Sequence, residues 1–245
     1  MDIGIWQTIP QPAISRYLGL MGWDWIVLDL QHGAMNWETA YECIYAARPT
    51  GARPLIRTSI GNPGEVEKAL DIGAGGVVVP MVNSRTEAQA VALAAKYPPT
   101  GVRSLGGDHY LHYGDDYFEK ANDETLLLVQ MEHIDAVEQA EEIMALPGVD
   151  GCFVGPVDLA LSLGLSRHRS SYEQQPAYQA AMERIVTTTL AAGKKPCCNT
   201  YTPEDFAAKK AAGFQALTFK SDLDLLMDRG TQLLDCLKGS TGDSV

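Results

Sequence analysis

The amino-acid sequence predicts a TIM barrel, a closed barrel of eight parallel strands surrounded by helices. Eight segments rich in β-branched and aromatic residues recur along the chain, and each precedes a segment of helical periodicity. This alternation indicates βα units and a parallel sheet. The length of 245 residues agrees with the roughly 250 residues of a typical eight-unit barrel. A doubly wound open sheet is the alternative fold.

Each predicted unit joins a short apolar or β-branched run to a segment with helical spacing of its apolar residues. The strands are predicted, in chain order, at residues 3–9, 25–30, 54–58, 76–82, 125–132, 151–155, 195–200 and 216–220. The helices are predicted at 11–21, 36–47, 63–72, 84–96, 134–145, 157–163, 174–192, 203–212 and 222–237. Because no Ser/Gly/Pro linker divides the chain, one domain spanning residues 1–245 is expected.

Composition limits the class of protein and its partners. The hydrophobic content of 46% supports a large core. The net charge of −12, from 19 basic and 31 acidic residues, argues against a nucleic-acid or anionic-membrane partner. The chain begins without a basic segment and has no run of 18 apolar residues, so a cytoplasmic protein is expected. The five cysteines lack CxxC spacing and are expected to be reduced and mostly buried.

Two carboxylates follow adjacent predicted strands. Gln130 and Glu132 share one face of the fifth strand, and Asp158 follows the sixth strand at the start of a helix. Neighbouring strands lie about 4.8 Å apart, so both carboxylates are placed to share one small ion. Such a pair suits a hard divalent cation that keeps water or takes oxygens from a substrate. The alternatives are a solvated strand end for Glu132 and a purely helix-dipole role for Asp158.

Other polar residues are expected at the same rim, where the active site of a TIM barrel lies. Asp29 ends the second strand and His32 lies in the loop after it. Arg57 ends the third strand. The alternatives are a structural ion pair between Asp29 and Arg57, a surface role for His32, and a backbone hydrogen bond for Gln130. The gathering of all these groups at one rim favours a functional site.

Three further features carry less weight. The connection at residues 101–117 is long for a compact domain, which indicates a functional or mobile loop. Its His109 and His112 are expected to be exposed, with contact to a substrate as the alternative. Asp71 is interpreted as an ordinary acid at a helix end, and Asn199, near the end of the seventh strand, is expected to face the barrel mouth.

Five motifs together resemble a known family. They are, in order, VLDLQHGAMN, PLIRTSIGNPGEVEKALDIGAGGVVVPMVNSRTEA, KYPPTGVRS, LLLVQMEHIDAVE and GVDGCFVGPVDLALSLG. Their order and spacing resemble the HpcH/HpaI family of metal-dependent (class II) pyruvate aldolases, of the 4-hydroxy-2-oxoheptanedioate and 2-keto-3-deoxy acid aldolase type. The resemblance implies a TIM barrel whose last helix is exchanged between partners, and dimers assembled into a homohexamer.

The resemblance also implies a role for each rim residue. By this resemblance Glu132 and Asp158 bind the metal, and His32 is the acid/base. Arg57 binds substrate and stabilises the oxyanion, while Asp29 orients the histidine and a water. Gln130 lies near pyruvate, and Asp71 contacts His32 of a neighbouring subunit. Glutamate is common in the family where Gln31 stands, which puts the acceptor preference in question.

The implied reaction is reversible aldol cleavage of 4-hydroxy-2-oxo acids to pyruvate and an aldehyde, through a metal-stabilised pyruvate enolate. Mg²⁺, Mn²⁺ or Co²⁺ would serve as the Lewis acid. Backbone N–H groups of Val157 and Asp158, opening the helix after Gly155, are expected to bind the pyruvate carboxylate, and Gly155 is expected to belong to the same substrate-binding site. His32 would move the proton of the C4 hydroxyl.

Three rival functions remain. A Schiff-base (class I) aldolase would use Lys220, at the end of the eighth strand, as its nucleophile. A citryl- or malyl-CoA-type lyase would keep the metal and carboxylates but take a thioester, for which the acidic composition offers no evident phosphate site. A catalytically silent barrel would serve as a scaffold, since fold alone never establishes activity.

Overall fold

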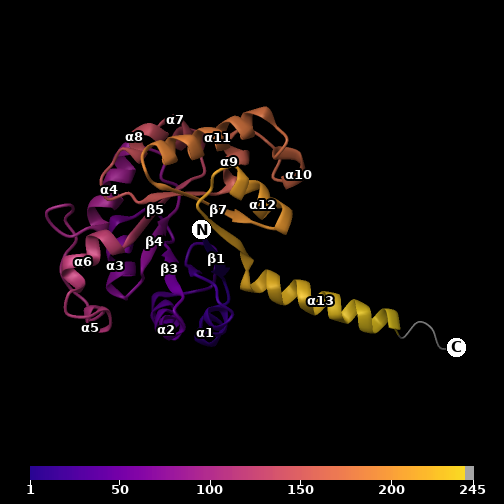
Figure 1. The fold of residues 1–245 in the computed structure, drawn as a ribbon, viewed down its shortest axis with the longest axis horizontal. Helices are drawn as coiled ribbons and strands as arrows, with labels where there is room; N and C mark the ends of the chain where they lie inside the picture. Colours follow the sequence, from indigo (N-terminus) through magenta and orange to yellow (C-terminus); the bar gives the residue numbers. More distant parts are fainter. Residues whose placement is uncertain (241–245) are drawn as a thin grey trace.

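Eight parallel strands close into a barrel in chain order, with β1 pairing with β8 (Figure 1). The computed structural model describes residues 1–240. The strands are β1 (Asp2–Gln7), β2 (Trp25–Asp29), β3 (Arg53–Arg57), β4 (Gly76–Val79), β5 (Leu126–Met131), β6 (Gly151–Val154), β7 (Lys195–Thr200) and β8 (Ala216–Ser221). The predicted TIM barrel is confirmed and the open sheet is excluded. Residues 241–245 of the predicted domain lie outside the described residues.

Helices surround the barrel and connect its strands. They are α1 (Pro12–Leu20), α2 (Trp37–Ala47), α3 (Pro63–Asp71), α4 (Arg85–Ala95), α5 (Tyr110–Tyr113), α6 (Tyr117–Glu124), α7 (Ile134–Glu138), α8 (Ala140–Met144), α9 (Pro156–Ser162), α10 (Arg169–Tyr172), α11 (Pro176–Ala191), α12 (Pro203–Ala211) and α13 (Asp222–Ser240). The single helix predicted at 134–145 is divided at Gln139, whose backbone departs from helical values. The predicted loop at 101–117 contains α5 and the start of α6, two helices too short or too polar for periodicity to reveal.

Side-chain caps explain where several helices begin. The side chains of Asn36, Ser84 and Thr202 accept hydrogen bonds from backbone N–H groups three residues later. These groups have no partner inside the helix, so each cap stabilises its helix by about 1 kcal/mol. The caps hold the βα loops at the carboxyl ends of the strands, where the polar residues gather.

Alternation along the strands divides the barrel interior into an apolar floor and a polar mouth. The interior apolar cluster comprises Trp6, Trp25, Val27, Leu55, Val78, Leu126, Leu128, Phe153, Cys197 and Ala216. Two residues further along the same faces come Asp29 on β2, Arg57 on β3 and Gln130 on β5. Because all strands are parallel, these polar side chains meet at one rim.

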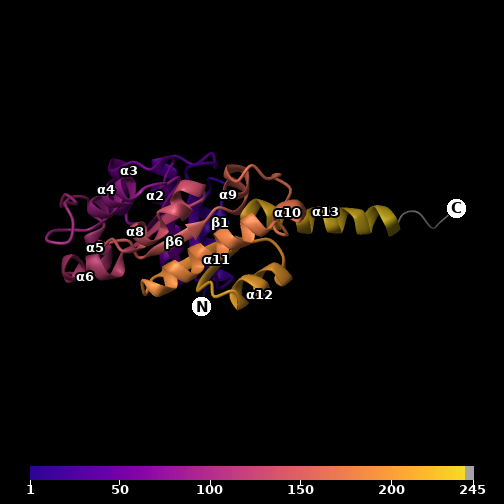
Figure 2. The same ribbon diagram turned by 90° about the horizontal axis from the view of Figure 1, so that it is seen from above.

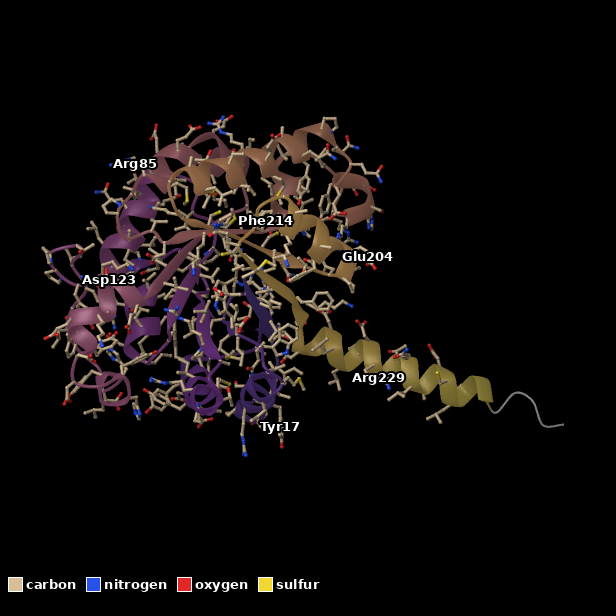
Figure 3. The ribbon with its side chains drawn as sticks, viewed as in Figure 1. Tyr17, Arg85, Asp123, Glu204, Phe214 and Arg229 are labelled. Carbon is tan, nitrogen blue, oxygen red and sulfur yellow. The ribbon has the colours of Figure 1, made fainter. Side chains whose placement is uncertain are left out.

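The last helix projects away from the barrel. Two perpendicular views show α13 extending outward from β8 (Figures 1 and 2). Figure 3 places Arg229 on this projecting helix and Tyr17 on α1, at the outer edge of the barrel. The large apolar side chains exposed on α13 are Leu223, Leu226, Met227, Leu233, Leu234 and Leu237. Their three- and four-residue spacing puts them on one face of the helix.

The cysteine prediction is confirmed. No disulfide joins the cysteines within residues 1–240, and four of the five are buried while Cys236 is exposed. In residues 1–240, no helix is both long and apolar enough to cross a membrane.

Candidate active site

A cavity of about 210 Å³ opens at the carboxyl ends of the strands. Its lining residues are Trp6, Thr8, Asp29, Arg57, Gln130, Glu132, Phe153, Val154, Gly155, Pro156, Val157, Asp158, Asn199, Tyr201, Lys220, Ser221 and Asp224. Sites for drug-sized ligands occupy roughly 300–1,000 Å³, so this cavity suits a substrate with few non-hydrogen atoms. It brings together seven of the predicted site residues, namely Asp29, Arg57, Gln130, Glu132, Gly155, Val157 and Asp158.

Glu132 is the buried carboxylate of the site, and two hydrogen bonds fix it. The backbone N–H of Met81 donates to Oε1 at 2.9 Å, and Nε2 of Gln130 donates to Oε2 at 2.7 Å. Burial raises the pKa of Glu132; the Met81 N–H lowers it, and the nearby Asp158 carboxylate raises it. Glu132 is only 3% exposed, so the predicted alternative of a solvated strand end is wrong.

Gly155 makes room for that carboxylate. A Cβ at this position would lie 2.2 Å from Oε2 of Glu132 and 2.9 Å from its Cβ, closer than any side chain tolerates. Glycine therefore allows β6 to approach the carboxylate closely. Gly155 was predicted to belong to the substrate-binding site. Its steric role could not be predicted, because the clash depends on the register between β5 and β6.

Met81 is a site residue that sequence reasoning missed. Its backbone lies in the left-handed region, with φ of 52°, just after β4 ends. This conformation costs a non-glycine residue roughly 1–2 kcal/mol and turns its N–H toward Glu132. The predicted strand at 76–82 is three residues too long for the same reason. A methionine gives no sequence signal for a left-handed backbone.

Asp158 supplies the second carboxylate from the first turn of α9, and its side chain is exposed. Within residues 1–240 its carboxylate accepts no hydrogen bond, whereas both oxygens of Glu132 are held. One fixed and one free carboxylate therefore face the same cavity. The Asp158 oxygens remain available to a ligand.

The donor set fits a hard divalent cation. Oxygen ligands are the ones that Mg²⁺ prefers, and Mg²⁺ usually takes only one or two carboxylates from the protein. The buried Oε1 of Gln130 has no hydrogen-bond partner beside these carboxylates, which supplies a further unsatisfied oxygen. No cluster of three or more His, Cys, Asp or Glu side chains suited to a metal occurs in the described part of the chain. The site thus resembles an open, catalytic cation site and not a closed structural one.

Asp29 and Arg57 form the predicted buried ion pair. Nε and Nη2 of Arg57 donate to the two oxygens of Asp29 at 2.9 and 2.7 Å. The Arg57 guanidinium also lies 4.4 Å from the ring centroid of Trp6. Asp29 is 2% exposed, yet Arg57 still lines the cavity. Asp29 therefore fixes the positively charged guanidinium of Arg57 at the cavity wall.

His32 lies outside the cavity lining, with an exposed side chain. Oδ1 of Asp29 accepts hydrogen bonds from the backbone N–H groups of Gln31 and His32, at 3.1 and 3.2 Å. Asp29 therefore orients the backbone of the histidine loop, while the imidazole makes no hydrogen bond within residues 1–240. Gly33 is needed for this turn, because a Cβ there would lie 2.4 Å from the carbonyl oxygen of Asp29.

Asp71 lies at the end of α3 and does not line the cavity. Asp71 and His32 are thus the two predicted catalytic residues that lie outside the cavity lining. Nη2 of Arg103 donates a 2.8 Å hydrogen bond to Oδ1 of Asp71, and the two side chains form an ion pair. His109, expected to be exposed, is fully buried beside this pair, and burial lowers its pKa. That prediction was wrong because Arg103 and Tyr117 fold over the imidazole. His112 is exposed, as expected.

Asn199 on β7 lines the cavity and faces its mouth, as expected. Nε1 of Trp6 donates to Oγ1 of Thr218, and that hydroxyl donates to Oδ1 of Asn199, both at 2.9 Å. This chain fixes the wall. Tyr201 and Lys220 also line the cavity. Lys220 was predicted only as the nucleophile of the Schiff-base alternative, and Tyr201 was not predicted.

Fold and site together define a barrel lyase, with paired carboxylates and an arginine at the carboxyl ends of the strands. Comparison of the sequence with protein families agrees with this class. Residues 2–223 match the model of the HpcH/HpaI aldolase/citrate lyase family, and the chain belongs to that family. It is accordingly an enzyme of the carbon–carbon lyase class.

The chain is similar to several proteins of known name. A hydroxypyruvate/pyruvate aldolase of Rhizorhabdus wittichii is 32% identical over 230 residues, which cover 94% of this chain and 91% of that protein. A 4-hydroxy-2-oxo-heptane-1,7-dioate aldolase of Salmonella arizonae is 31% identical, covering 95% and 88%. The solved structure of citrate synthase SbnG matches with a TM-score of 0.87 at 27% identity, covering 99% of this chain and 95% of that one.

Proposed function

We propose that the protein is a divalent-metal-dependent pyruvate aldolase that cleaves 4-hydroxy-2-oxo acids reversibly to pyruvate and an aldehyde. The observation that supports it most is the pairing of Glu132, fixed and buried, with the free carboxylate of Asp158. A cation held there would supply a Lewis acid for the keto and carboxylate oxygens of pyruvate. Mg²⁺, Mn²⁺ and Co²⁺ all suit these ligands.

The chain's own groups bind and orient pyruvate around that position. Backbone N–H groups of Val157 and Asp158 lie in the first turn of α9, where they have no partner within the helix, and they would donate to the pyruvate carboxylate. Gln130 holds Glu132 through its amide N–H and presents its unpaired oxygen to the same space. Gly155, which has no side chain, leaves room for the Glu132 carboxylate itself.

Arg57 would stabilise negative charge as it develops on the keto oxygen during carbon–carbon cleavage. Its guanidinium is held by Asp29 on two donors, so it needs no reorganisation when that charge forms. His32 would take the proton of the C4 hydroxyl and return it in the synthetic direction, through a water, since its imidazole lies outside the cavity lining.

We further propose a homo-oligomer, based on dimers and assembled into a hexamer, in which α13 packs on a partner. A helix that projects with six large apolar side chains on one face gains little from the barrel of its own chain. Burial of those side chains against a second copy would contribute about 1.5–3 kcal/mol for each one fully buried. In such an assembly Asp71 would face His32 of a neighbouring subunit, although within one chain it pairs with Arg103.

Pyruvate release from a 4-hydroxy-2-oxo acid tests the proposed function. The assay couples pyruvate to lactate dehydrogenase and compares added Mn²⁺, excess EDTA, and EDTA followed by Mn²⁺. Activity should disappear with EDTA and return with the metal, and Glu132→Gln should remain inactive throughout. Activity that persists in EDTA would contradict the metal-dependent route and direct attention to Lys220.

Citrate formation or cleavage is the second candidate, because a citrate synthase is among the similar structures. A thioester form of this chemistry needs space for coenzyme A, and a cavity of about 210 Å³ holds only the reacting end. Incubation with oxaloacetate and acetyl-CoA, with thiol release as the readout, separates this candidate from pyruvate aldol chemistry.

A further inference from the structure

Lys220 has a backbone conformation that lysine rarely adopts. Its φ is +54°, in the left-handed region where residues other than glycine are uncommon. Strain of this kind persists only where the surrounding structure imposes it, and it clusters at ligand sites. Lys220 is also one of the residues that line the cavity.

The pairing of β8 with β1 is irregular at the same place. Gly4 pairs with Thr218, but Trp6 pairs with Ser221, so β8 has one residue more than β1 between these two pairs. A bulge of this kind changes the direction of a side chain and is common beside active sites. The bulge and the left-handed backbone together place a lysine on the cavity wall.

Two cationic side chains line the cavity, Arg57 and Lys220, and the ion-pair partner of Lys220 is the more easily replaced. Both donor atoms of Arg57 that face Asp29 are occupied in a buried pair. The ammonium of Lys220 pairs instead with Asp228 on α13, and that side chain is 60% exposed. Exposed ion pairs contribute little to stability, so an incoming anion can replace Asp228 at small cost.

We propose that Lys220 determines substrate specificity by binding an anionic group on the aldehyde half of the substrate, in competition with Asp228. This inference rests on the proposed pyruvate aldolase function. The pyruvate half uses the end of the cavity near Glu132, so an anion at Lys220 belongs to the other reactant. An ammonium is a compact charge with three donors, so a carboxylate and a phosphate both suit it.

The test measures kcat/KM for addition of pyruvate to two matched pairs of acceptors, with Mn²⁺ present. Succinic semialdehyde is compared with butanal, and glyceraldehyde 3-phosphate with glyceraldehyde. Within a pair, the ratio of the anionic to the neutral acceptor should fall about tenfold to a hundredfold in Lys220→Met, the size of a charge-assisted hydrogen bond. The pair with the larger fall identifies the anion.

Three further variants separate charge from backbone strain. Lys220→Gly relaxes the left-handed backbone and should lower the ratio as Lys220→Met does, whereas Lys220→Arg should retain most of it. Asp228→Asn should raise the ratio about two- to fivefold, because a competitor is removed. Lys210→Met, which makes the same change of charge at an exposed position on α12, should leave the ratio unchanged.

Several outcomes overturn the inference. If the wild-type ratio is near one in both pairs, or if anionic and neutral acceptors decline equally in Lys220→Met and Lys220→Gly, Lys220 does not select an anion, and the proposed function still stands. Trapping of pyruvate on Lys220 by borohydride would show a nucleophile instead. If the wild type adds pyruvate to no acceptor, the proposed function fails and the inference fails with it.

Discussion

Replacing Gly155 with alanine tests how the site holds its buried carboxylate. The added Cβ would lie 2.2 Å from Oε2 of Glu132, more than about 1 Å inside ordinary contact, and 2.9 Å from the Glu132 Cβ. The whole side chain must therefore shift, because both ends of it are too close. A shift of that size weakens the hydrogen bonds from Met81 and Gln130, each contributing about 1.5–3 kcal/mol to a charged acceptor.

The expected result of Gly155→Ala is a loss of at least about a hundredfold in kcat/KM for pyruvate release, because a displacement of about 1 Å in a catalytic site costs that much. Mn²⁺ affinity, measured by titration calorimetry, should fall in parallel. Gly106→Ala is the matched control, since a Cβ there meets nothing within 4 Å. Circular dichroism checks that both variants fold. Wild-type Mn²⁺ affinity and rate in Gly155→Ala would refute this explanation of the glycine.

Three other predictions concern His32, Asp29 and Glu132. His32→Ala should leave Mn²⁺ affinity intact and lower kcat by about 10²–10⁴-fold; an unchanged rate would remove His32 from the mechanism. Asp29→Asn should lower the free energy of unfolding by about 3 kcal/mol in urea denaturation, because it leaves the charge of its arginine partner unpaired; a loss below about 0.5 kcal/mol would contradict this. The raised pKa of Glu132 means that, without metal, the native state binds more protons than the unfolded state between the ordinary and the raised pKa. Unfolding free energy should therefore fall as pH rises through that window, and Glu132→Gln should remove this fall; identical pH profiles would show that Glu132 is not the cause.

The barrel was predictable because its local signals agree. Apolar runs such as those of β2 and β5, each followed by helical periodicity, indicate parallel strands. Two-residue alternation alone puts Gln130 and Glu132 on one face of β5. Parallel strands then bring Asp29, Arg57 and Asp158 to the same rim. These site residues follow from pattern and topology alone.

Other parts of the site depend on tertiary structure that no local pattern encodes. The left-handed backbones of Met81 and Lys220 arise where a strand ends or bulges, and neither residue type signals it. His109 is buried between Arg103 and Tyr117 of its own connection and beside Asp71 at the end of α3, a packing that the polar sequence around it does not indicate. The spacing of apolar residues predicts an apolar face on α13, but no local pattern predicts that the helix projects from the barrel.

The most direct test of the proposed chemistry is exchange of the methyl protons of pyruvate in D₂O, followed by NMR with no aldehyde present. Exchange reports formation of the pyruvate enolate and does not depend on the acceptor. The wild type should exchange these protons with Mg²⁺ and stop after EDTA, and Glu132→Gln should exchange them at the uncatalysed rate. Exchange that continues in EDTA, or that survives in Glu132→Gln, would contradict the assignment of the Glu132 and Asp158 carboxylates as the cation site.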